Sequence, residues 1–336
     1  MSRFKAGITS HQSPMSGSRA EIAKKLQSLL QNNTADERED AHRLDEARRI
    51  LARLVQEGDF RYDDQKVPPQ QKKWHTFLRQ EHRKLVNQLC DRIRKGKRTG
   101  IRTLWGVMAA TPVGSTQDVL SAELMFQYVQ AMCSWPSFED RSVRNMLNEF
   151  FGPYRDAQYY GMGAITRQAA RMYEANSHED ADKLLEMLMI IPIVQDKDAM
   201  DASRDALFPP PEEIVDVSDD DDEEEEESDD DASRGKSSDD DSVTAAPPRK
   251  KKKTAKEVKR VAFLKASRQH AAWSKAWLAV LRLHLSTSGL RKALRFLPDN
   301  VLRYVPNPLR FSDFFMQAYD GTGVTPDMAL EGSIEL

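Results

Sequence analysis

The sequence predicts an all-α protein, an irregular α-solenoid or helical-repeat scaffold that is interrupted by a long disordered linker, first acidic and then basic. Apolar residues recur at helical spacing in one segment after another on both sides of this linker. The breaks between the segments are short and carry Pro or Gly. We find no convincing period-2 alternation bounded by turns, so we expect no β-sheet. No fixed self-similarity appears at the periods of the regular repeat families.

Composition divides the 336 residues into four parts. We expect a flexible N-terminus over 1–17, a helical-repeat region over 18–208, a disordered linker over 209–253 and the start of a second helical domain over 254–336. Residues 212–241 contain 18 Asp and Glu against Arg234 and Lys236. Like-charge repulsion and the lack of apolar residues prevent a core there. Because the whole chain has a net charge of −3, the rest sums to +13, and such a basic body suggests a polyanionic partner.

Capping signals and apolar stripes define the first helices. Ser18 and Glu21 form a capping box ahead of a first stripe, Ile22, Leu26, Leu29 and Leu30. Thr34 and Glu37 repeat the signal before a longer helix that Gly58 ends. Pro68 and Pro69 precede a third helix over 70–95.

The remaining helices are placed by their breaks. Ser115 and Asp118 resemble a cap ahead of a stripe from Leu120 to Met132, and helices follow near 138–151, 155–175 and 178–190. After the linker, a helix with Trp273 and Trp277 leads to a second helix that Pro298 should stop. A third should bury Leu309, Phe311, Phe314, Phe315 and Ala318. Short loops between such helices make them antiparallel neighbours.

Several function classes find little support in the residues. The two cysteines, Cys90 and Cys133, fall in apolar helical patterns, where free Cys behaves as a buried hydrophobe, and a reducing compartment fits them. The seven His residues form no metal-ligand spacing, and nucleotide-binding Gly-rich loops and nucleophile motifs do not occur. We therefore expect no enzyme and no cofactor. The longest apolar run, 187–194, is far shorter than the ~20 residues of a membrane span. The first twenty residues lack the apolar core of a secretory signal, and their basic composition leaves a transit peptide open.

A basic cluster runs along the third helix and beyond it. Between Lys72 and Arg102, eleven Lys and Arg stand against Glu81 and Asp91. Cations at a helix C-terminus also suit the helix dipole, which accounts for part of the cluster. The sharper interpretation is contact with an RNA backbone, without base-specific reading because no aromatic platform accompanies the charges. The candidate contacts are Lys72, Lys73, Arg79, Arg83, Arg92, Arg94, Lys95, Lys97 and Arg98.

The linker carries two further signals. Five contiguous cations beside Pro247 and Pro248 are typical of a nuclear import signal or a phosphate-contacting arm: Arg249, Lys250, Lys251, Lys252 and Lys253. Four serines each have Asp three residues later, the pattern of an acidophilic kinase site: Ser218, Ser228, Ser237 and Ser238. The acidic tract could equally serve as a solubilising linker or bind basic proteins.

Residues 272–333 carry the most specific pattern. The segment contains "WLAVLR", Pro306 and Pro308 in "VPNPLRFSDFF", Asp313 with Phe314, "AYDGTGV" with Asp320, and Ala329–Leu330 with Gly332. It resembles the CCAAT-binding-factor domain family of nucleolar complex proteins, in particular its nucleolar complex protein four group. The stretch "KKWHTFLRQEHRKLVNQL" adds a weaker likeness. The resemblance implies structural roles for Trp273, Trp277, Pro306, Pro308, Asp313, Phe314 and Asp320.

The resemblance also implies a function. The family is a nucleolar scaffold that pairs with nucleolar protein fourteen in the small-subunit processome and supports pre-rRNA processing. Pro326, Asp327 and Glu331 depart from its pattern, and its members continue beyond the position of Leu336, so we expect a C-terminally truncated member with an exposed apolar end. The expected function is ribosome biogenesis in the nucleus and nucleolus, through protein docking and contact with pre-rRNA. The alternative is a chromatin- or transcription-associated protein that binds histones with its acidic tract.

Overall fold

A computed structural model describes residues 19–31, 36–60, 69–110, 120–136, 138, 140–192, 266–305 and 307–320. These residues hold eleven α-helices, three short 3₁₀ turns and no strand, which confirms the all-α prediction. The predicted flexible N-terminus (1–17) and the predicted linker (209–253) lie outside the described residues.

The first two helices, α1 (Arg19–Gln31) and α2 (Glu37–Gln56), pack against each other. The prediction that Thr34 opens α2 was wrong, because the carboxylate of Asp36 accepts the backbone N–H of Arg38 and caps the helix. Asp is as good a cap as Thr, and it lies immediately before the first helical residue. Gly58 ends the helix as predicted, with a left-handed φ of 75° and its N–H bonded to the carbonyl of Val55.

The basic segment folds as two helices, because α3 (Lys72–Arg94) is followed directly by α4 (Arg98–Ala110). Gly96, at a φ of 75°, makes the sharp end of α3, and the N–H of Lys97 returns to the carbonyl of Arg92. Helix α4 was not predicted from the sequence, although Ile101, Leu104, Trp105 and Met108 are its buried stripe. At Gly100 the two helices approach so closely that a Cβ would lie 3.0 Å from the carbonyl oxygen of Leu89.

The middle of the chain forms α5 (Ala122–Cys133), α6 (Arg141–Phe151), α7 (Arg155–Glu174) and α8 (Ala181–Ile190), close to the predicted ranges. The cap of α5 is Ser121, whose hydroxyl accepts the N–H of Leu124 at 3.2 Å. The predicted cap, Ser115 with Asp118, lies outside the described residues.

The segment after the linker forms α11 (Ala266–Leu281), α12 (Thr287–Asn300), two 3₁₀ turns (Leu302–Tyr304 and Pro308–Phe311) and α13 (Ser312–Asp320). Pro298 does not stop α12, which runs two residues further. In the last turn a missing N–H leaves only one carbonyl without its donor, so Pro is tolerated there. Phe311, Phe315 and Ala318 are buried as predicted, but Leu309 was wrongly assigned to the core, since it is 64% exposed.

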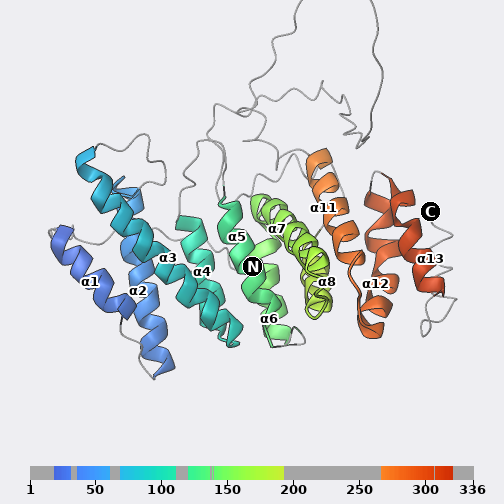
Figure 1. The fold of residues 1–336 in the computed structure, drawn as a ribbon, viewed down its shortest axis with the longest axis horizontal. Coiled ribbons are helices and arrows are strands. Elements are labelled where there is room, and N and C mark those ends of the chain that lie inside the picture. Colours follow the sequence, from blue (N-terminus) through green and yellow to red (C-terminus); the bar gives the residue numbers. More distant parts are fainter. Residues whose placement is uncertain are drawn as a thin grey trace, which may run out of the picture.

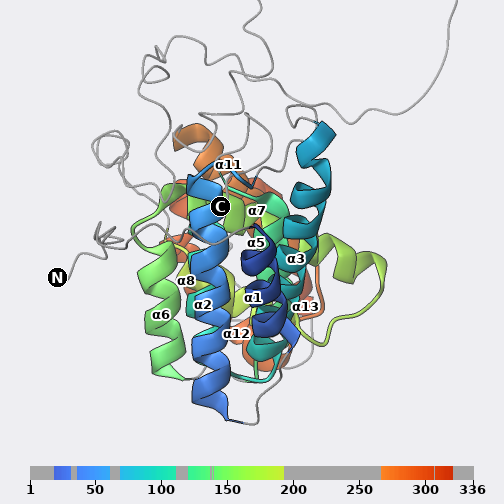
Figure 2. The ribbon, with the colours of Figure 1, turned by 90° about the vertical axis from the view of Figure 1, so that its left-hand side faces the viewer.

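The helices stand side by side along one long axis, from α1 at one end to α13 at the other (Figure 1), and run nearly parallel or antiparallel when seen from the α1 end (Figure 2). The two regions that flank the linker pack directly together, because α11 contacts α7 and α8, and α12 contacts α8. Their buried side chains belong to a single core. Residues 19–192 and 266–320 are therefore one continuous array.

Large aromatic side chains fill this core. The ring of Trp105 contacts Tyr128, Phe150 and Phe151, and Trp277 stacks on Phe296 with centroids 5.6 Å apart. Both cysteines are buried free thiols, as the sequence predicted. Burial raises the pKa of Cys90 to about 11 and that of Cys133 to about 12, so neither thiol is a ready nucleophile.

Candidate nucleic-acid interface

Helix α3 presents one apolar face to the array and one polar face to solvent. Its buried positions include Leu78, Leu85, Leu89 and Ile93. The exposed positions include Lys72, Thr76, Arg83, Asn87 and Arg94, which share one face because they follow one another at intervals of four or seven residues. The apolar stripe thus fixes which cations of the predicted cluster reach solvent.

Arg92 is not a candidate for RNA contact, because its side chain is buried and bonded inside the protein. Its guanidinium forms an ion pair with Asp40 of α2 and donates to the hydroxyl of Thr99. Asp40 also pairs with Arg43, which in turn donates to the last-turn carbonyl of Leu29 in α1. Arg92 therefore belongs to a network that joins α1, α2 and α3.

The cations at the α3–α4 junction are also paired with carboxylates. Arg94 pairs with Asp91 at 2.7 Å, and Lys97 pairs with Glu37 at 2.7 Å. Arg98 pairs with Asp140, the cap of α6. The hydrogen bonds from Ser142, and then Arg98, lower the pKa of Asp140. The pairs of Lys97 and Arg98 connect the junction to α2 and α6, whereas the pair of Arg94 lies within α3.

Four predicted contacts are left with exposed charges. Lys72, Lys73, Arg83 and Lys95 are exposed, and within the described part of the chain none of them forms an ion pair. Arg79 is half-buried and donates from Nε to the carbonyl of His75 at 3.4 Å. Arg102 of α4, which was not among the predicted contacts, is exposed and equally unpaired among the described residues. The structure therefore reduces the candidate interface to the solvent face of α3, Lys95 at its end and Arg102 on α4.

The residues that carry the family resemblance have structural positions. Trp273 and Trp277 are 2% and 0% exposed and pack edge to face. Pro308 begins a 3₁₀ turn, Asp313 is exposed in the first turn of α13, and Phe314 is half-buried against the core. Asp320 is the last residue of α13. Pro306 lies outside the described residues.

The linker candidates are outside the described residues as well. This applies to the import candidates Arg249, Lys250, Lys251, Lys252 and Lys253, and to the phosphorylation candidates Ser218, Ser228, Ser237 and Ser238. Both assignments stay predictions.

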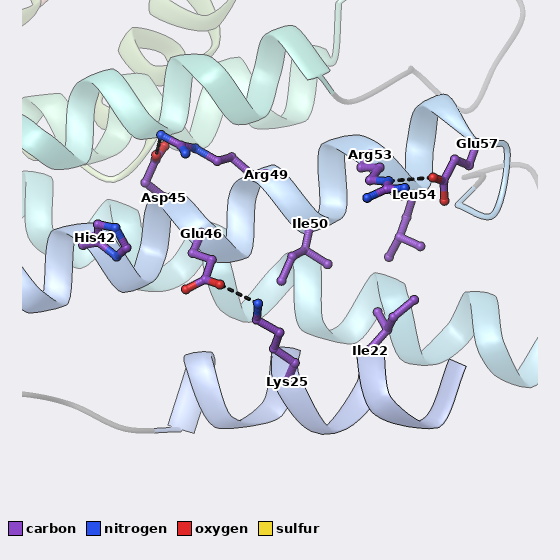
Figure 3. A pocket seen from close by; sticks show the side chains of 10 residues that line it. All are labelled: Ile22, Lys25, His42, Asp45, Glu46, Arg49, Ile50, Arg53, Leu54 and Glu57. Carbon is purple, nitrogen blue, oxygen red and sulfur yellow. Dashed lines mark hydrogen bonds and ion pairs between the residues drawn. The ribbon is translucent and has the colours of Figure 1, made fainter. Parts of the chain in front are cut away.

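A pocket with a volume of about 280 Å³ lies between α1 and α2 (Figure 3). Ile22, Ile50 and Leu54 supply its apolar lining. Its charges neutralise one another, since Lys25 pairs with Glu46, Arg49 with Asp45 and Arg53 with Glu57. His42 is the remaining titratable side chain of the lining.

The described residues contain no group of three or more His, Cys, Asp or Glu placed to hold a metal ion. No helix in that part of the chain is both long and apolar enough to cross a membrane. No protein-family model matches the chain, and no curated protein matches it. The fold and the surface together define a class, an all-α helical array with a basic, solvent-facing helix.

Proposed function

We propose that this chain is a non-enzymatic scaffold in the nucleolar assembly of the small ribosomal subunit. It docks protein partners, nucleolar protein fourteen among them, along its helix faces and holds the backbone of pre-rRNA through α3. The resemblance of residues 272–333 to the CCAAT-binding-factor domain family motivates the choice of pathway. The observation that carries the RNA contact is the set of exposed cations on α3 that form no ion pair with any other described residue.

The α3 surface fits a repetitive anion. Lys72 and Arg83 lie on one face three turns apart, roughly 16 Å along the axis. Cations at such spacing attract phosphates of a nucleic-acid backbone and release counterions, which supplies affinity without sequence specificity. Trp74 and Phe77 on the same helix are half-buried and stack on each other, so they support packing rather than base stacking.

RNA binding can be tested with the full chain. We expect the triple variant Lys72→Gln, Lys73→Gln, Arg83→Gln to bind poly(U) more weakly in fluorescence anisotropy, with a salt slope smaller by ~2. The matched control is Lys24→Gln, Arg141→Gln, Arg171→Gln, which removes the same charge from exposed positions on α1, α6 and α7. Equal losses of affinity in both variants would mean that binding depends on the net charge of the chain and not on the α3 surface.

The cellular role needs a separate experiment. Depletion should cause unprocessed small-subunit rRNA to accumulate, and affinity purification should recover processome proteins. Co-purification of histones that is lost when residues 212–241 are deleted, with rRNA processing intact, would favour the chromatin alternative instead.

A further inference from the structure

Helix α11 carries a line of cations that the predicted cluster did not include. Arg268, Lys275 and Arg282 recur at intervals of seven residues. Seven residues are nearly two helical turns, so the three side chains share one face, about 10.5 Å apart at each step. Arg282 follows the last residue of α11, and its N–H still bonds to the carbonyl of Leu278. All three are exposed, while Trp273 and Trp277 fill the opposite face.

No carboxylate of the described residues compensates this line. The sequence from 266 to 298 contains six Lys and Arg and no Asp or Glu. None of the three cations of the line forms an ion pair within the described residues. In contrast, Arg48, Arg49 and Arg53 of α2 each have a carboxylate partner three or four residues away. The exposed face of α11 thus differs from an ordinary solvated helix face, where charges of both signs alternate.

We propose that this face of α11 is a second RNA-binding surface, which contacts the phosphate backbone. The proposal rests on the proposed function and extends it. A line of cations ~21 Å long matches an anion that repeats along a strand, and not a single carboxylate or phosphate. The helix has no exposed aromatic ring for stacking, because both of its Trp side chains are buried. Binding at this surface is therefore independent of base sequence.

The separation of α11 from α3 favours the binding of a long RNA. α3 and α11 are separated along the array by α5, α7 and α8 (Figure 1). An RNA long enough to reach both helices gains effective concentration at the second once it is held at the first. Two weak surfaces on one array then hold a long RNA more tightly than either surface holds a short one.

The test uses the full chain and poly(U) as the probe. The variant Arg268→Gln, Lys275→Gln, Arg282→Gln should bind about tenfold to a hundredfold more weakly at ~0.1 M salt, with a salt slope smaller by ~2. The control Lys24→Gln, Arg141→Gln, Arg171→Gln loses the same charge elsewhere. Circular dichroism verifies that the variants are folded, and an equal effect of both variants overturns the proposal.

A photo-crosslinking residue at Ala271, exposed between Arg268 and Lys275, tests direct contact. It should crosslink to poly(U), whereas the same group at exposed Ala175, at the end of α7, should not. A crosslink from position 271 to the chain's own residues 212–241 in place of RNA would overturn the proposal.

Loss of binding in the α3 variant alone overturns the α11 surface and leaves the proposed function standing. Loss in the α11 variant alone supports the α11 surface and removes α3, and loss in neither variant overturns both.

Discussion

The side-chain amide of Gln269 on α11 donates a hydrogen bond to the backbone carbonyl of Arg155 on α7, 3.0 Å away, across 114 positions of the chain. Gln269 is 3% exposed, so this polar bond lies inside the contact between the two regions that flank the linker. A buried side-chain amide must keep a hydrogen-bond partner, because an unsatisfied polar group in a dry contact is costly. The bond therefore sets the register of α11 on α7.

Gln269→Ala should lower the free energy of unfolding by about 1 kcal/mol, because a buried hydrogen bond between α11 and α7 is lost. Urea denaturation followed by circular dichroism measures the change. The control Ser267→Ala alters an exposed position two residues before Gln269 and should be nearly neutral. If both variants are equally stable, the contact between α7 and α11 is not as tight as described.

The network around Asp40 predicts a second difference. Asp40→Ala should cost of the order of 3 kcal/mol, because it removes the partner of two largely buried guanidinium groups, Arg43 and Arg92. Asp45→Ala on the same helix breaks pairs with Arg48 and Arg49 that are more exposed to solvent, which are worth about 0–1 kcal/mol. Chemical denaturation of the two variants gives the comparison. A similar loss for both would contradict a structural role for Arg92.

Acid should destabilise the protein through His82. Burial lowers the pKa of His82 from 6.5 to about 4, so the unfolded chain binds more protons than the folded one between these values. The free energy of unfolding should therefore fall as the pH drops from 6.5 to 4, by up to about 3 kcal/mol from this residue. Unfolding curves across this range measure the slope. His82→Leu should flatten it, and an unchanged slope in this variant would contradict the effect of burial on His82.

Gly289 predicts an effect at the start of α12. Asp182 of α8 accepts the N–H of Ser286 at 3.0 Å as well as its hydroxyl, and Ser286 caps α12. A Cβ on Gly289 would clash with the carboxylate of Asp182. Gly289→Ala should therefore displace this carboxylate and lower the free energy of unfolding by about 1–2 kcal/mol. Thermal denaturation measures the loss, and Ser288→Ala, at the exposed neighbouring position, should not show it.

The helices were predictable because each buries a regular apolar stripe, whereas their ends depended on details of single residues. Asp36 and Thr34 are both good caps, and only the backbone decides which one is used. Helix α4 was missed because Gly100 and Gly106 weaken its pattern, although Gly100 is there to let α3 approach. Leu309 has the right spacing for the core, but it lies in a 3₁₀ turn with a different periodicity.

Only part of the candidate surface could be predicted from the sequence. A count of cations cannot separate Arg92, whose carboxylate partner lies 52 positions away, from Arg83, which points to solvent. The line of cations on α11 was not predicted from the sequence, because its three members are spread over fifteen positions and never form a run. Only the helix brings them onto one face.

The packing of α11 and α12 on α7 and α8 has a consequence for how the polypeptide can be divided. The contacts that hold these helices together are buried side chains and the bonds of Gln269, Ser286 and Lys292, and none of them needs the covalent connection between Pro192 and Ala266. A protease cut anywhere in that interval would leave two fragments that remain one particle. The same protein could accordingly be produced as two separately expressed pieces that reassemble on mixing.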